Sequence, residues 1–142
     1  MEEFEKSCLK MKIEIQPRDI EILRFVFKFR VVTYDQIRRK FFASRHESAS
    51  RNRIRALAKS GFVRTFPKEA DGLFYKCVCL TEEAWPLIRE SFPFEVQTPY
   101  FESESPEHDH RIAEIAMRFE KLSLYEEMVT ENLFQSSEEF KS

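Results

Sequence analysis

Glycine is scarce in this 142-residue chain, which has only Gly61 and Gly72. Phosphate-binding loops need several glycines close together, so the sequence excludes a Gly-rich nucleotide site. Histidine occurs only at His46, His108 and His110, and no Ser-His-Asp set or paired-cysteine site is visible. We therefore expect a protein that is not an enzyme and that uses no metal ion or other cofactor.

Long apolar runs are also missing. None approaches the roughly 18 residues that a membrane-spanning helix needs. The first residues, MEEFEKSCLKMK, are acidic and charged, unlike the basic and then apolar start of a signal peptide. Cys8, Cys77 and Cys79 are odd in number, and a C-x-C pair inside a strand-like run is poorly placed to bond to itself. We expect a cytoplasmic protein with reduced cysteines and no membrane partner.

Charge is unevenly distributed along the chain, although the net charge is only −2. Residues 28–68 contain twelve Lys and Arg against Asp35 and Glu47, a net charge of +10, which leaves −12 for the remainder. Solubility alone does not require this separation. It indicates a localised anionic partner, of which nucleic acid is the usual one.

Apolar periodicity and capping signals predict three helices in the first half of the chain. The first begins at Pro17 and is apolar on more than one face, as a buried helix is. Val31 and Val32 are expected to end it. Thr33-x-x-Gln36 has the form of a capping box for a second helix over 33–42. The third helix begins after Ser44 or Ser48, two alternatives for its N-cap, and ends at a left-handed Gly61.

Strand and turn signals follow. The β-prone runs 62–67 and 74–80 flank a turn-forming Asp71-Gly72, which predicts a hairpin. A fourth helix is expected over 81–90, and 126–134 is a candidate strand. A fifth helix over 108–122 is expected to place four apolar residues on one face: Ile112, Ile115, Phe119 and Leu122.

This order predicts an α+β fold, mainly helical: a winged helix-turn-helix with an additional C-terminal helix. The expected organisation is an N-terminal extension at 1–16, the winged helix-turn-helix at 17–90, an acidic linker at 91–106, and a C-terminal helix and tail at 107–142. That last region would serve dimerisation or begin a second domain. Because the first helix is so apolar, we expect the fifth to pack on it, within one chain or across a homodimer.

The third helix carries the residues that point to double-stranded DNA. Its face opposite Ile54 and Leu57 bears side chains that hydrogen-bond base edges, since Arg reads guanine and Asn reads adenine in the major groove. Neighbouring cations would neutralise phosphates. The alternatives are a solvated basic face without a ligand and a winged helix that binds protein. The predicted DNA contacts are Arg38, Arg39, Lys40, Arg45, His46, Ser48, Arg51, Asn52, Arg53, Arg55, Lys59 and Lys68.

His108-Asp109-His110 is the other chemical feature. Metal-dependent phosphohydrolases use a His-Asp pair but need further His and Asp ligands, which this chain does not offer. Two histidines at i and i+2 also point to different sides of a helix. Because His108 lies four residues before Ile112, on the apolar seam, we favour a packing or capping role for it.

Three segments together resemble the replication-relaxation family of bacterial and mobile-element proteins: RDIEILRFVFKFRVVTYDQI, SRNRIRALAKSGFVRTF with YKCVCLTEEA, and HDHRIAEIAMRFE. The resemblance covers residues 17–122. It implies an N-terminal winged helix and a second region, often nuclease-like, that begins at the His-Asp pair. Glu114, Glu120 and Glu131 do not make a convincing metal site, and no Pro-Asp or Glu-x-Lys motif follows the helix, so catalysis is not supported.

These observations predict a transcriptional regulator, or an accessory factor for plasmid, phage or chromosomal replication, that binds duplex DNA. A protein-protein adaptor built on a winged helix is the main alternative. The N-terminal half of a truncated nuclease-like protein is a more remote one.

Overall fold

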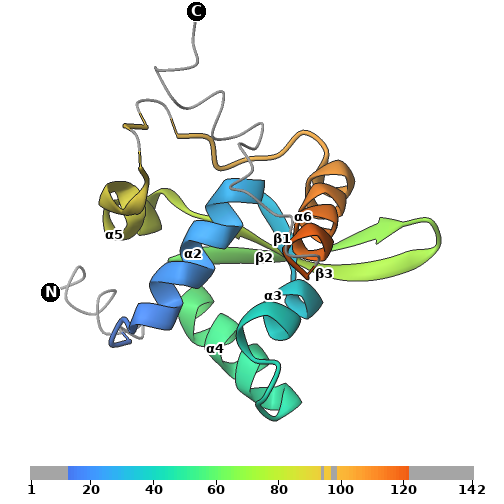
Figure 1. Cartoon of the computed structure of the whole chain (residues 1–142), viewed down its shortest axis with the longest axis horizontal. Helices are drawn as coiled ribbons and strands as arrows, with labels where there is room; N and C mark the ends of the chain where they lie inside the picture. The colour runs from blue at the N-terminus through green and yellow to red at the C-terminus, as the bar shows by residue number, and fades with distance from the viewer. Residues whose placement is uncertain (1–12, 94, 97–98, 122–142) are drawn as a thin grey trace, which may run out of the picture.

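The computed structural model describes residues 13–93, 95, 96 and 99–121. This part is α+β and mainly helical, with five α-helices and a three-stranded antiparallel sheet (Figure 1). The predicted strand over 126–134, the tail and Leu122 lie outside the described residues. The main elements in chain order are α2 (Pro17–Phe29), β1 (Val31–Thr33), α3 (Tyr34–Phe41), α4 (Glu47–Lys59), β2 (Val63–Ala70), β3 (Leu73–Leu80), α5 (Trp85–Ile88) and α6 (Pro106–Lys121).

The sheet has the strand order β1-β3-β2. Strand β1 corrects the expectation that Val31 and Val32 only terminate a helix, because both are buried and pair with Cys79 and Val78. Arg30, with φ of 66°, turns the chain between α2 and β1. A strand of three residues is too short for sequence periodicity to detect, and its partner lies more than forty residues further along the chain.

Strands β2 and β3 form the predicted hairpin. Asp71 and Gly72 at its turn have φ of 53° and 78°, the positive values of a two-residue turn that matches strand twist. The register pairs Pro67 with Lys76 and Lys68 with Tyr75. This register fixes which hairpin side chains share a face of the sheet.

Two of the predicted helix caps are present in the structure, and a third is formed by a different residue. Thr33 and Gln36 make the expected capping box at the start of α3, with hydrogen bonds of 3.1 and 3.0 Å. Gly61 follows α4 with φ of 85°, as expected. Neither serine caps α4, however. The N-cap is His46, whose Nδ1 accepts from the backbone N–H of Ser48.

The predicted fourth helix is interrupted. Residues 82–91 form a 3₁₀ turn, the four-residue α5 and a second 3₁₀ turn. The side chains of Trp85, Phe92 and Phe101 nevertheless pack together around buried Phe27 of α2. Part of the acidic segment after α5 therefore lies against the core.

Helix α6 packs beside α2 and β1 in the same chain, as expected for a cover of the apolar first helix (Figure 1). The buried face differs from the prediction: Ala113, Ala116 and Met117 are buried, whereas Ile115 and Phe119 remain 46% and 45% exposed. Because Ala113 and Ala116 are small, α6 can lie close to α2 and β1. Among the described residues, no helix has the length and apolar character to cross a bilayer.

Candidate nucleic-acid interface

The outer face of α4 carries four exposed polar side chains, Arg51, Asn52, Arg55 and Lys59, opposite buried Ile54 and Leu57. Ile54 and Leu57 fill the core between α4 and the rest of the domain, so their spacing forces the other positions outward. Within the described part of the chain, the side chains of these four polar residues make no hydrogen bond or ion pair. The three cations on this face are therefore available to an external anion.

The N-terminal end of α4 adds further exposed groups. Arg45 and His46 are exposed, and Ser48 is half-buried. His46 Nδ1 lies 2.9 Å from Ser48 Oγ. Exposed Glu47 is an acidic side chain at this end. The backbone N–H of Ser48 already donates to His46 Nδ1. An external ligand would therefore meet side chains at this end of α4 more than free backbone N–H groups.

Arg53 was predicted to flank the exposed face, and the structure gives it an internal partner instead. Its guanidinium pairs with fully buried Asp19 of α2 and donates to the carbonyl of Glu14 at 2.9 Å. Burial raises the pKa of Asp19, but hydrogen bonds from Arg53 and the Gln16 backbone outweigh it and hold the pKa below its usual value. Arg53 joins α4 to α2 and is no longer free for DNA.

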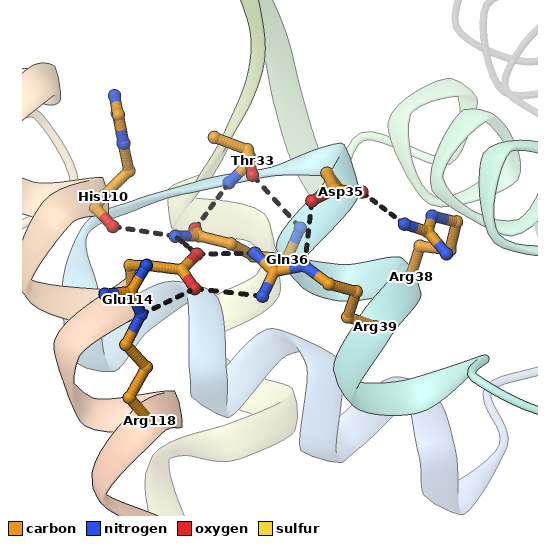
Figure 2. Close-up of polar contacts among 8 residues, drawn as sticks. All are labelled: Thr33, Asp35, Gln36, Arg38, Arg39, His110, Glu114 and Arg118. Atoms are coloured by element: carbon orange, nitrogen blue, oxygen red, sulfur yellow. Dashed lines mark hydrogen bonds and ion pairs between the residues drawn. The ribbon is translucent and has the colours of Figure 1, made fainter.

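The cations late in α3 are also engaged within the chain, as Figure 2 shows for Arg38 and Arg39. Arg38 pairs with Asp35 at 2.5 Å, and Arg39 reaches both Asp35 at 2.8 Å and Glu114 of α6. Lys40 Nζ lies 2.8 Å from a carboxylate oxygen of Glu120, also on α6. Of these three, only Arg38 is paired solely within α3, so a phosphate would compete with α6 for Arg39 and Lys40.

Glu114 is the centre of the α3–α6 network (Figure 2). It accepts two hydrogen bonds from Arg39, at 3.0 and 2.5 Å, and a third from the side chain of Gln36 at 3.3 Å. Chiefly because Arg39 donates to it, the pKa of Glu114 lies below its usual value. Gln36 also donates to the backbone carbonyl of His110 at 2.8 Å. These bonds fix α6 on the side of α3.

The hairpin presents two lysines on opposite faces. Lys68 pairs with Tyr75, whose ring contacts that of His110 of α6 in a tilted arrangement, with ring centroids 4.8 Å apart. Lys76 is one residue further along β3 and therefore faces the other way. Its Nζ lies 5.9 Å from the ring centroid of Tyr34, and it lines a groove with Ser50 and Arg51 of α4. The hairpin cation on the α4 side is thus Lys76.

Lys76 was missed because it lies outside the basic segment of the sequence. The alternation in FYKCVCL, combined with the hairpin register, was the signal that could have assigned its face. Lys76 pairs with Pro67, and Lys68 is the next residue along β2. The predicted Lys68 and the missed Lys76 therefore project from opposite faces of the hairpin.

The His-Asp-His motif has a packing role, although at a different residue from the one expected. His108 is exposed, whereas His110 is 5% exposed and packs its ring against Tyr75. Burial lowers the pKa of His110, which favours its neutral form. Asp109 accepts from the hydroxyl of Ser103. In the described part of the chain, no three His, Cys, Asp or Glu side chains gather in a way that could hold a metal ion.

No protein-family model matches the chain, and no curated protein matches it. The resemblance to the replication-relaxation family therefore stays a hypothesis that the sequence segments alone support.

Proposed function

We propose that this chain is a winged helix-turn-helix protein that binds double-stranded DNA, with α4 in the major groove. The observation that carries the proposal is the exposed face of α4, where Arg51, Arg55 and Lys59 have no partner among the described residues. A helix fits the major groove, and unpaired cations on its outer face suit the phosphates on either side.

The order of the elements supports the winged-helix assignment. A helix (α2), a short strand (β1), two helices joined by a short turn (α3 and α4) and a hairpin (β2 and β3) follow one another, with β1 completing the sheet. In such an arrangement the second helix of the pair reads DNA and the hairpin is the wing.

Different residues suit different parts of a duplex. Arg55 and Asn52 have the paired donors or acceptors that guanine and adenine edges match. Arg51, Lys59, Arg45 and Lys76 suit the phosphates, which set affinity more than sequence preference.

A regulatory or accessory role in transcription or replication fits a small DNA-binding domain. We propose that it acts in the cytoplasm on plasmid, phage or chromosomal DNA, and that it binds without cleaving. The family resemblance favours replication.

A salt-dependent titration of a fluorescent random-sequence duplex tests the proposal. If about five phosphates are neutralised, log affinity should fall against log salt with a slope of about −4 to −5. Binding that is absent for varied duplexes even at low salt would contradict DNA binding. Adding Mg²⁺ or Mn²⁺ should leave the duplex intact, and reproducible cleavage lost in Asp109→Ala would contradict the non-enzymatic role.

A second candidate function is protein binding, in the form of an adaptor or a homodimer. Ile115 and Phe119, four residues apart on α6, are nearly half exposed and provide the specific observation in its favour. An apolar pair on a helix is a common protein contact, and it does not conflict with DNA binding by α4.

A further inference from the structure

The tip of the hairpin exposes two large apolar side chains. Leu73 is 60% exposed and Phe74 is 78% exposed, more than any other large apolar side chain among the described residues. A single exposed Leu on a protein surface is ordinary. Leu73 and Phe74 are neighbours at the end of the hairpin, so a partner that approaches the tip would contact their apolar surface.

The tip is held in a defined position. Strands β2 and β3 pair along eight residues each, and the turn at Asp71 and Gly72 is a tight two-residue turn. Asp71 also forms an ion pair with Arg111 of α6, which ties the turn to the body of the domain. Phe74 is therefore presented on a braced support rather than on a loose loop.

Phe74 faces the same side as α4. It lies two residues before Lys76 in β3, so both side chains project from one face of the strand. Lys76 borders the groove that Ser50 and Arg51 of α4 also line. Phe74 then lies about 7 Å further toward the tip on that side. A duplex lying along α4 would continue toward Phe74.

We propose that Phe74 is an apolar wedge that enters the minor groove next to the major groove occupied by α4 and opens a base step there. Apolar side chains inserted in this way unstack a step and bend the duplex toward the major groove. This inference rests on the proposed function and adds to it a DNA-bending role for the hairpin.

The hairpin carries both lysines and acidic side chains, and its two lysines favour nucleic acid as the occupant. Lys68 and Lys76 project from opposite faces of the hairpin and can approach the phosphates on both sides of a narrow groove. Glu69, opposite Phe74, is exposed and would repel those phosphates. Replacing it, as in Glu69→Gln, should therefore tighten binding.

Bending is measured with duplexes that carry a donor and an acceptor dye at their ends. Unstacking is measured separately with duplexes that contain 2-aminopurine. The wild-type protein should shorten the end-to-end distance and raise the 2-aminopurine fluorescence at one step. Phe74→Ala should bind about tenfold more weakly and lose both signals. Phe119→Ala removes a ring that is 45% exposed on α6, away from the hairpin, and should keep both signals.

The outcomes separate the wedge from the proposed function. Wild-type protein that binds duplex without bending or unstacking it would overturn the wedge and leave DNA binding intact. The wedge is likewise overturned if Phe74→Ala retains both signals, or if it instead changes the oligomeric state in light scattering. A wild-type protein that binds no duplex would overturn both proposals.

Discussion

Arg53 and Arg55 are two positions apart in α4 and have opposite surroundings. The side chain of Arg53 is 19% exposed and is paired with buried Asp19, whereas Arg55 is exposed and unpaired among the described residues. Helical geometry produces this contrast, because a shift of two residues turns a side chain by about 200° around the axis. Residue type and neighbourhood in the sequence are the same for both.

Alanine at each position should therefore have a different consequence. Arg53→Ala leaves the Asp19 carboxylate buried without its cation and should lower the free energy of unfolding by about 3 kcal/mol. Arg55→Ala should change it by less than about 0.5 kcal/mol and should weaken DNA binding instead. Urea denaturation and duplex titration of both variants measure this. Equal loss of stability in the two would contradict the assignment.

Asn52 is the residue best suited to read sequence. Its amide can donate to and accept from one adenine edge, and Asn52→Ala should weaken a preferred site by about 1–3 kcal/mol while sparing random DNA. Selection from a random duplex library supplies the preferred site. Loss of the same size on both DNAs would mean that α4 does not read bases, and the regulator role would then be dropped.

At the scale of elements, α6 bridges the rest of the domain through polar and aromatic contacts. Gln36 of α3 donates to its backbone and Arg39 of α3 donates to Glu114, while the ring of His110 packs against Tyr75 of the hairpin. The buried His110 Nε2 has no hydrogen-bond partner in the described structure. Protonation of that ring would place a charge with an unsatisfied Nε2 donor in a buried position against Tyr75.

Stability should consequently depend on pH through His110. Burial lowers its folded-state pKa, so the unfolded chain binds the proton more readily below about pH 6.5. The free energy of unfolding should fall as pH drops from about 7 toward 5. His110→Phe keeps an aromatic ring against Tyr75 and should flatten this dependence, whereas replacing exposed His108 by Ala should not. An unchanged pH profile in His110→Phe would contradict this role of the buried ring.

The elements that could be predicted from sequence are those defined locally. The capping box at Thr33, the turn at Asp71-Gly72 and the left-handed Gly61 depend on neighbouring residues, and all three are present. The hydrophobic stripe of α4 likewise identified its outer face. Local signals were less decisive at the start of α4, where the sequence predicted Ser44 or Ser48 as the N-cap and the structure has His46.

Features defined by distant contacts were missed. Strand β1 exists because β3 pairs with it, and the inner face of α6 is set by its close approach to α2 and β1 rather than by its largest apolar residues. Arg39, Lys40 and Arg53 each have a partner that is distant in the sequence, 75, 80 and 34 positions away. Counting basic residues could not separate these paired cations from the unpaired ones of α4.

At the scale of the whole molecule, folding brings acidic residues from the C-terminal part of the sequence next to some cations of the basic segment. Acidic side chains of α6 return to α3, where Glu114 and Glu120 pair with Arg39 and Lys40. Among the described residues, the cations on α4 (Arg51, Arg55 and Lys59) and the two lysines of the hairpin have no ion-pair partner. The proposed interface is therefore narrower than the basic segment of the sequence.

A charge-matched comparison tests the position of this interface most directly. Arg55→Ala/Lys59→Ala removes two cations from the outer face of α4. Arg89→Ala/Arg118→Ala removes two from elsewhere, with side chains 60% and 77% exposed. Both variants lose the same net charge, so a general electrostatic effect would weaken them equally.

Duplex titrations of the wild type and these two double variants at several salt concentrations provide the measurement. We expect the α4 variant to lose at least tenfold in affinity and its salt slope to flatten by about one unit, since the phosphate contact of Lys59 is gone and Arg55 contacts a base edge. The Arg89/Arg118 variant should keep the wild-type slope and an affinity within about threefold. Equal losses in the two variants, or a larger loss in the Arg89/Arg118 variant, would contradict DNA binding through α4.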